Sequence, residues 1–215
     1  PYTTLFRSDF DKPATELTLL DFQQLEARIQ SLDNTLSQTR NRLALVRPLA
    51  ALNDDAEATL SLLDAGKDLS GAARAMLSGV EPALTFLVAG DADSAITQTT
   101  TSGEQIINLL ELGEGRFLQA QQRLEAALSQ MDATDLGTVS PDLLLNIEEL
   151  REFHTLLTQT NTLLLNLPEV LTAVLGLETE QTYLVLAQNN DEIRPSGGYI
   201  STYGWMQVRD AQITA

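Results

Sequence analysis

The chain has 215 residues, of which 43% are hydrophobic and only 5% aromatic, and its formal net charge is -17 at pH 7. Such a composition is typical of a globular chain with an aliphatic core, and the negative charge argues against binding to nucleic acid or to anionic lipid. The chain has no cysteine, which excludes disulfides, thiolate metal ligands and a cysteine nucleophile.

The two ends of the chain are atypical of a complete protein. No run of about 18 apolar residues is present, so the sequence predicts no membrane-spanning helix in this fragment. The first eight residues read as a foreign leader, and residues 1–12 are left out of the expected fold. Ala215 falls within an expected strand. We therefore expect a fragment of a longer protein.

The first expected helix covers residues 15–47 and stops at Pro48. Its apolar positions recur in alternating steps of three and four residues, which is the pattern of a coiled-coil-like seam. The seam positions are Phe22, Leu25, Ile29, Leu32, Leu36, Thr39, Leu43 and Val46.

The second expected helix begins at Asn53 or Asp54, because either side chain can cap exposed backbone N–H groups. Gly79 and Pro82 predict a break or a kink, with Pro82 opening a new short helix over residues 82–88. The seam continues through Leu62, Ala65, Leu69, Ala72, Met76 and Val80.

The third expected helix begins near Asp91 or Asp93 and reaches Met131. Its seam contains several small residues, which either interrupt the helix at residues 99–103 or let a partner helix approach closely. The seam positions are Ile96, Thr99, Gly103, Ile106, Leu110, Gly113, Phe117, Ala120, Leu124, Ala127 and Met131.

The fourth expected helix begins at Ser140-Pro141-Asp142, where a capping residue precedes a proline and an acid. His154 and Asn161 lie at the edge of its apolar stripe. Pro168 is expected to begin a last short helix that ends at Gly176. The stripe consists of Leu143, Ile147, Leu150, Phe153, Leu157 and Leu164.

The pattern then changes from helix to strand. Residues 182–187 and 199–208 are rich in β-branched and aromatic side chains, Asp210-Ala211 indicates a turn, and Ile213 a third strand. The expected fold class is therefore mainly α, an antiparallel long-helix (coiled-coil-like) bundle over residues 13–176 followed by a small antiparallel β segment. Residues 177–215 would form a hairpin that begins a further β-containing domain.

The densest polar cluster of the chain follows the first expected strand. With its two flanking strands it resembles the signature of a bacterial family known as domain of unknown function 4012. That signature has an apolar strand, Gln-Asn-Asn, Glu and Arg at alternate positions, Gly-Gly and a second strand. The turn at residues 210–211 departs from the family, which often has a glycine there, so its type stays open. The matching residues are Gln188, Asn189, Asn190, Glu192, Arg194, Gly197 and Gly198.

The resemblance implies an extracytoplasmic or cell-surface domain, usually anchored by a preceding membrane-spanning helix, and it implies no known activity. The cluster has two interpretations. In the structural one, which we favour, Glu192 and Arg194 pair with each other or with neighbours, and the two glycines supply positive φ angles. In the functional one, Asn189, Glu192 and Arg194 line a site for a glycan or an anionic group.

Other candidate sites are weaker, and no catalytic residue, metal ligand or cofactor is expected. His154 is the only histidine and reads as a helix-edge residue. The stretch 91–94 begins like a calcium loop but lacks its distal acid, so we interpret it as a helix cap. Glu148, Glu149 and Glu152 lack the partners of a di-metal bundle.

The function expected from these features is a non-enzymatic, extracytoplasmic structural or assembly protein that acts through helix-bundle contacts with protein partners, including copies of itself. The alternative is a ligand-binding or enzymatic accessory domain of surface polysaccharide metabolism, with a cell-surface glycan at residues 189–198. A third possibility is an intracellular coiled-coil scaffold.

Overall fold

The computed structural model describes residues 19–44, 53–89, 102–135, 137, 139–189 and 199–214. Within these ranges four α-helices precede a three-stranded antiparallel sheet, so the predicted class, mainly α with a C-terminal β segment, is confirmed. The helices are α2 (Leu19–Ala44), α4 (Asp54–Ala89), α5 (Ser102–Asp132) and α6 (Pro141–Val174). The strands are β1 (Gln181–Asn189), β2 (Tyr199–Arg209) and β3 (Gln212–Ile213).

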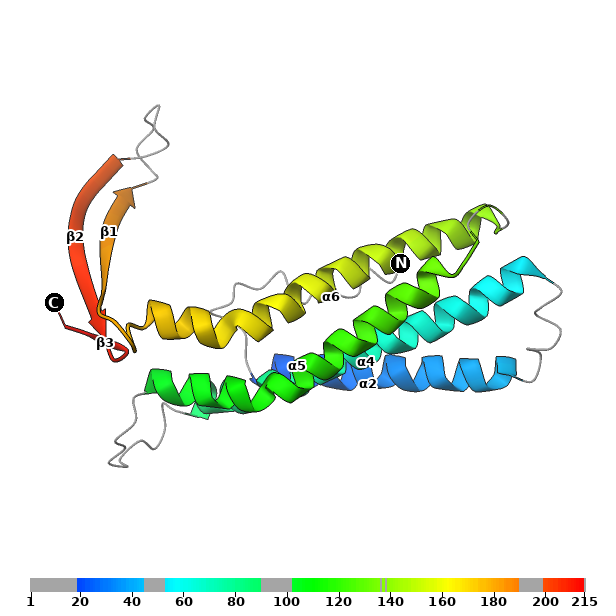
Figure 1. Ribbon diagram of the computed structural model, residues 1–215, viewed down its shortest axis with the longest axis horizontal. Coiled ribbons are helices and arrows are strands. Elements are labelled where there is room, and N and C mark those ends of the chain that lie inside the picture. Colours follow the sequence, from blue (N-terminus) through cyan, green and yellow to red (C-terminus); the bar gives the residue numbers. More distant parts are fainter. Residues whose placement is uncertain are drawn as a thin grey trace.

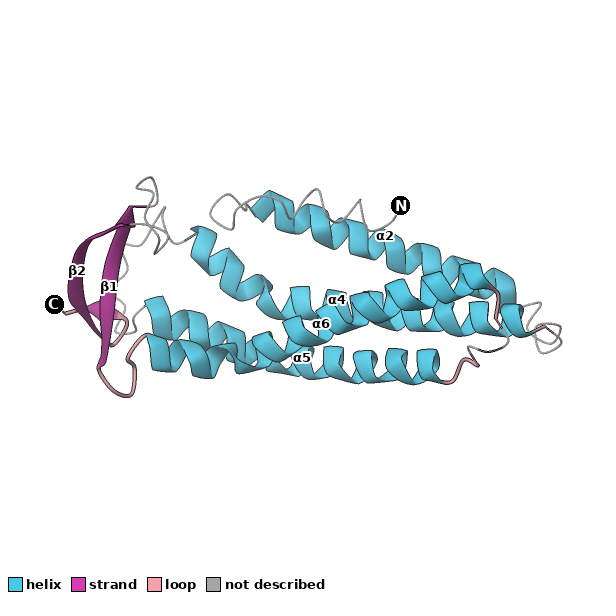
Figure 2. Cartoon of the chain, turned by 90° about the horizontal axis from the view of Figure 1, so that it is seen from above, coloured by secondary structure: helices cyan, strands magenta, loops and turns pink. Residues whose placement is uncertain are grey.

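The helices lie side by side in an elongated bundle, and successive helices run in opposite directions (Figure 1). The helix α4 contacts the other three, and its contact with α5 is the most extensive. The sheet projects from one end of the bundle (Figure 2). None of the described helices has a stretch that is apolar enough to cross a membrane.

The core of the bundle lies between α4, α5 and α6, and the predicted seams supply most of it. Leu69 of α4 and Phe117 of α5 are almost completely buried. Ile147 of α6 is buried in the same cluster as Leu69, as the seam on that helix predicted. The buried cluster consists of Leu62, Ala65, Leu69, Ala72, Ala75, Met76, Ala120, Leu124, Ala127, Met131 and Ile147.

The backbones of α4 and α5 approach each other closely where two glycines face. A Cβ atom added to Gly113 would lie 2.4 Å from the carbonyl oxygen of Gly79. A Cβ atom on Gly79 would lie 2.4 Å from the ring of Phe117. Gly113 therefore lets α4 approach α5 closely, which is one of the two roles predicted for the small residues of this seam.

Helix α2 is fastened to α4 by polar contacts as well as by its seam. The guanidinium of Arg40 donates hydrogen bonds to the Asp64 carboxylate, and this contact raises the pKa of Arg40. The hydroxyl of Ser70 donates to Asp33 at 3.3 Å. These bonds connect residues that are far apart in sequence, so they help to set the register of α2 on α4.

The structure corrects the predicted helix break in α4. This helix is continuous from Asp54 to Ala89, with Pro82 inside it, so no separate helix begins at Pro82. A proline removes one backbone hydrogen bond, but the surrounding residues keep their packing against α5, as the buried Gly79 and Ala83 illustrate. Because α4 is continuous, the predicted break at Pro82 is ruled out, and a kink is the alternative that stays open.

Helix α6 begins as predicted, with Ser140 at the cap position and Pro141 in the first turn. The Ser140 side chain makes no capping bond; its backbone N–H instead donates to Asp55 at 2.8 Å. The prediction that Pro168 begins a new helix is wrong, because α6 is unbroken to Val174. Asn161, predicted at the edge of the stripe, is 3% exposed and lies in the buried face.

Some helix predictions lie outside the described residues. These are the expected ends of the first helix beyond Leu19–Ala44, and the start of the third helix at residues 91–101, including the calcium-like stretch. The described part of the third helix begins at Ser102.

Candidate functional site

The hairpin of β1 and β2 projects away from the bundle (Figure 1), and two residues of the predicted motif lie at the end of β1. Gln188 is exposed near the end of β1 and lies opposite Ile200, and the backbone of Asn189 pairs with Tyr199. The other motif residues lie outside the described part of the chain, so their predicted roles stay predictions. They are Asn190, Glu192, Arg194, Gly197 and Gly198.

One face of this hairpin is apolar and exposed, and we call it the apolar face. Residues that lie directly opposite each other on antiparallel strands share a face. Leu184 pairs with Trp205 and Leu186 pairs with Tyr203, so all four side chains point to the same side. Together with Ile200 they are between 48% and 72% exposed.

An irregularity in the strands places Ile200 on this face. The register shifts between Ala187 and Gln188, so that Ser201 is an extra residue on β2. Without that bulge Ile200 would point to the other side, because side chains alternate along a strand. The Ser201 hydroxyl donates to the carbonyl of Ala187 at 3.3 Å, which helps to hold the bulge.

The base of the hairpin is joined to the end of α6 by backbone hydrogen bonds. Gly176 has a φ of 65° and ends the helix, with the N–H of Leu177 bonded to the Thr172 carbonyl at 3.2 Å. The N–H of Asp210 donates to Gly176 at 3.1 Å, and that of Ala211 donates to Leu175 at 2.9 Å. The helix cap therefore holds the β2–β3 turn directly.

The turn itself has the predicted position and a specific conformation. Asp210 and Ala211 have φ angles of 50° and 57°, the pattern of a type I′ turn, which is reached here without a glycine. A Cβ atom on Gly103 of α5 would lie 2.6 Å from the Ala211 Cβ atom, so Gly103 makes room for the turn. The Tyr183 hydroxyl donates to the Val174 carbonyl at 2.5 Å and adds a further link.

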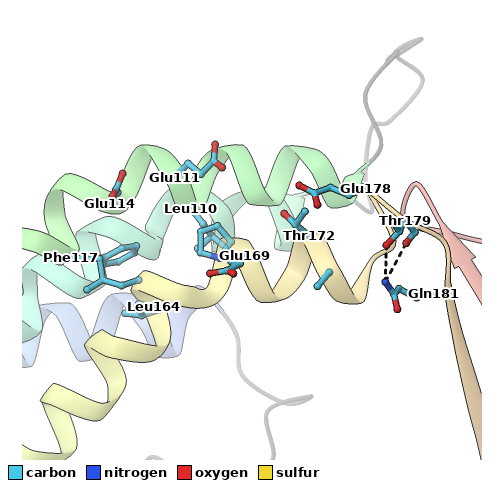
Figure 3. Close-up of a pocket in the computed structure, with 13 residues that line it drawn as sticks. Leu110, Glu111, Glu114, Phe117, Leu164, Glu169, Thr172, Glu178, Thr179 and Gln181 are labelled. Atoms are coloured by element: carbon cyan, nitrogen blue, oxygen red, sulfur yellow. Dashed lines mark hydrogen bonds between the residues drawn. The ribbon is translucent and has the colours of Figure 1, made fainter.

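A groove of about 510 Å³ lies beside this junction, between α5, α6 and the segment that leads into β1 (Figure 3). Its floor includes Leu110 and Phe117, and its rim is acidic. The residues that line it include no histidine, lysine or arginine. The lining carboxylates are Glu111, Glu114, Glu169 and Glu178.

The other polar candidates take structural or solvent-exposed positions. The Nε2 of His154 donates to the Leu124 carbonyl at 3.1 Å, so this histidine ties α6 to α5. Glu148, Glu149 and Glu152 are exposed on α6. Across the described residues no cluster of histidine, aspartate and glutamate side chains has an arrangement suited to a metal ion.

The apolar face was not identified from the sequence, although a signal for it was present. Leu184 and Leu186 alternate on one strand, and Tyr203 and Trp205 alternate on the next. An antiparallel pairing of the two strands brings both pairs to one side in many registers. The alternation does not show whether another element covers that side. In the structure, no described element does.

The comparisons with known proteins concern this same region. Residues 178–215 match the family model described as "Protein of unknown function (DUF4012)". The match confirms the family resemblance for the segment that contains the hairpin. Neither the curated proteins nor the solved structures contain a significant match to the chain.

Proposed function

We propose that the chain, whose residues 178–215 match the family model described as "Protein of unknown function (DUF4012)", is a non-enzymatic assembly module of the bacterial cell surface. In this proposal the helical bundle is a rigid support, and the hairpin at its end binds a partner protein. The observation that carries the proposal is the apolar face of the hairpin.

The composition of the apolar face favours protein recognition. Tyr203 and Trp205 are the side-chain types that most often dominate the binding energy of protein interfaces. Each pairs with a leucine across the strands, which gives a contiguous patch rather than scattered exposed residues. The two strands contain no charged residue before Arg209, although the chain carries a net charge of -17.

The bundle is suited to holding this patch in place. The hairpin is bonded to the α6 cap through Asp210 and Ala211 and to the helix end through Tyr183. A two-stranded hairpin by itself is only marginally stable in water. Because its base is held in place, the hairpin loses less conformational entropy when a partner binds.

The position of one polar group supports the non-enzymatic part of the proposal. The ring of the single histidine is bonded to the Leu124 carbonyl, so His154 joins α6 to α5. The cell-surface location rests on the family resemblance alone.

Site-specific photo-crosslinking in cells that make the full-length protein tests the proposal. A photoreactive residue at position 205 lies on the apolar face, and one at position 202 lies on the opposite face of the same strand. Adducts with another protein are expected from position 205 and not from position 202. Equal adducts from both positions, or crosslinks from 205 only within the same chain, would contradict the proposal.

The location can be tested separately because the chain has no cysteine of its own. A Thr202→Cys variant places one exposed thiol on the hairpin. A membrane-impermeant maleimide should label it in intact cells. Labelling that requires cell lysis would show that the hairpin is on the cytoplasmic side.

A further inference from the structure

Helix α6 has two apolar stripes, and the bundle covers only one of them. Asn161 in the covered stripe is 3% exposed, whereas Leu163 is 59% exposed. Residues two positions apart lie about 160° apart around an α-helix, so these side chains point in nearly opposite directions. The uncovered stripe, called here the outer seam, consists of Leu156, Thr160, Leu163, Leu167, Val170 and Val174.

The outer seam has the spacing of a helix-pairing surface. Its positions follow one another in steps of four, three, four, three and four residues. This alternation is the heptad pattern of a and d positions, which keeps a stripe facing a second helix along its length. From Leu156 to Val174 the seam extends for about 27 Å at 1.5 Å per residue.

Five of the six residues of the outer seam are exposed among the described residues, and Leu167 is half-buried. Leu156, Leu163, Val170 and Val174 are between 47% and 59% exposed. Figure 1 shows α6 along one edge of the bundle, and the other described helices all lie to one side of it. A contiguous apolar stripe that faces water marks a contact surface more often than a functionless one.

The lack of charged residues along the outer seam allows a second copy of this acidic chain to approach. Residues 153–168 contain no aspartate, glutamate, lysine or arginine, although the chain has a net charge of -17. On one flank of the seam Gln159, Asn166 and Ala173 are also uncharged. Two copies can therefore meet along the seam without bringing carboxylates into contact.

We infer that the outer seam of α6 pairs with the outer seam of a second copy, with the two helices antiparallel. An antiparallel pair matches every seam position: Leu156 with Val174, Thr160 with Val170, and Leu163 with Leu167 of the other copy. A parallel pair would bring Glu149 and Glu152 of the two copies together at the N-terminal end of the seam. In the antiparallel pair these carboxylates of the two copies lie at opposite ends of the seam, so charge favours this direction.

The inferred dimer deepens the proposed function, on which it rests in part, because it makes a second copy one partner of the assembly module. Antiparallel pairing of α6 places the two hairpins at opposite ends of the dimer, since each hairpin follows the C-terminal end of its own α6. The dimer would thus present two apolar faces to two separate partner proteins.

Sedimentation velocity over micromolar to millimolar concentration tests the pairing. The wild-type chain is expected to pass from monomer to dimer, and Leu163→Glu to weaken the dimer at least about tenfold, because the exchange buries two carboxylates. Leu112→Glu is the matched control, since Leu112 is 79% exposed on α5 and lies outside the seam. A wild-type monomer throughout, or equal effects of both variants, would overturn the inference.

Cysteine crosslinking tests the direction, because every thiol in this chain is introduced by design. The double variant Thr160→Cys with Val170→Cys should form a covalent dimer under mild oxidation, and each single variant should not. Crosslinking of the single Thr160→Cys variant would instead show a parallel pair and overturn the antiparallel assignment.

Two further measurements keep this inference separate from the hairpin proposal. Added salt should strengthen the dimer, because it screens the repulsion between two acidic chains; a dimer that salt weakens would contradict an apolar seam. Trp205→Ser should leave the dimer intact while it removes the hairpin contacts. A dimer lost in Trp205→Ser but kept in Leu163→Glu would place self-association on the hairpin.

Discussion

The bundle and the hairpin use similar apolar side chains in opposite ways. Phe117 in α5 is 1% exposed, and its ring packs against the backbone of α4 at Gly79. Trp205 in β2 is 68% exposed and lies opposite a leucine of β1. Residue type alone therefore does not distinguish core from contact surface in this chain. The division depends on whether another element covers the face on which the side chain lies.

Truncating the two aromatic residues tests this difference between the bundle and the hairpin most directly. Phe117→Ala should lower the free energy of unfolding by about 4 kcal/mol, because it leaves a cavity between α4 and α5. Trp205→Ala should lower it by less than about 1 kcal/mol, the size of one cross-strand pair. Chemical denaturation followed by circular dichroism at helical wavelengths measures both. Similar losses in the two variants would mean that the apolar face is part of the core.

The close contact of α4 and α5 gives a smaller but sharper test. Gly113→Ala should destabilise the bundle by about 3 kcal/mol, because the added Cβ atom would meet the Gly79 carbonyl oxygen. Gly115→Ala, two residues further along the same helix, has nothing within 4 Å of its added Cβ atom. That variant should stabilise the chain by up to about 1 kcal/mol through helix propensity. If the signs of the two changes in melting temperature agree, the close approach is wrong.

The smallest expected effect concerns the junction between the two regions. Gly176→Ala would force a side chain into a positive φ angle, with its Cβ atom 2.3 Å from the Val208 carbonyl oxygen. We expect the hairpin to loosen by about 2 kcal/mol while the bundle stays folded. Faster hydrogen exchange at the amides of Asp210 and Ala211 would report this loosening.

A matched control for the junction lies in β2. An added Cβ atom at Gly204 meets nothing within 4 Å, so Gly204→Ala should leave the exchange of both amides unchanged. Equal acceleration in the two variants would mean that the helix cap does not hold the turn.

Much of the local structure could be predicted from the sequence because it follows from short-range patterns. The seam on α5 predicted the burial of Phe117, Ala120 and Leu124, which the structure confirms. The signals of Ser140 and Pro141 predicted the start of α6, and the turn at Asp210-Ala211 has its predicted place. In each case the sequence signal is local: a repeat along one helix, a cap before a helix, or a turn between two strands.

The prolines were harder to interpret because their effect depends on packing. Pro82 and Pro168 each signal a helix start by their type, yet both lie inside continuous helices. A proline inside a helix loses one hydrogen bond and crowds the preceding turn, at a cost of about 3 kcal/mol. Whether the helix continues depends on the contacts of the flanking turns with other helices, which a single sequence does not display.

The sequence by itself therefore determined the heptad seams, the change from helix to strand at the end of α6, and the family model that residues 178–215 match. Only the tertiary structure decided which faces stay uncovered: the outer seam of α6 and the apolar face of the hairpin. The physical reason is that periodicity is a local property, set by 3.6 residues per helical turn or two per strand repeat. Coverage of a face depends on where distant elements come to lie, and two apolar stripes on one helix look alike until one of them is packed.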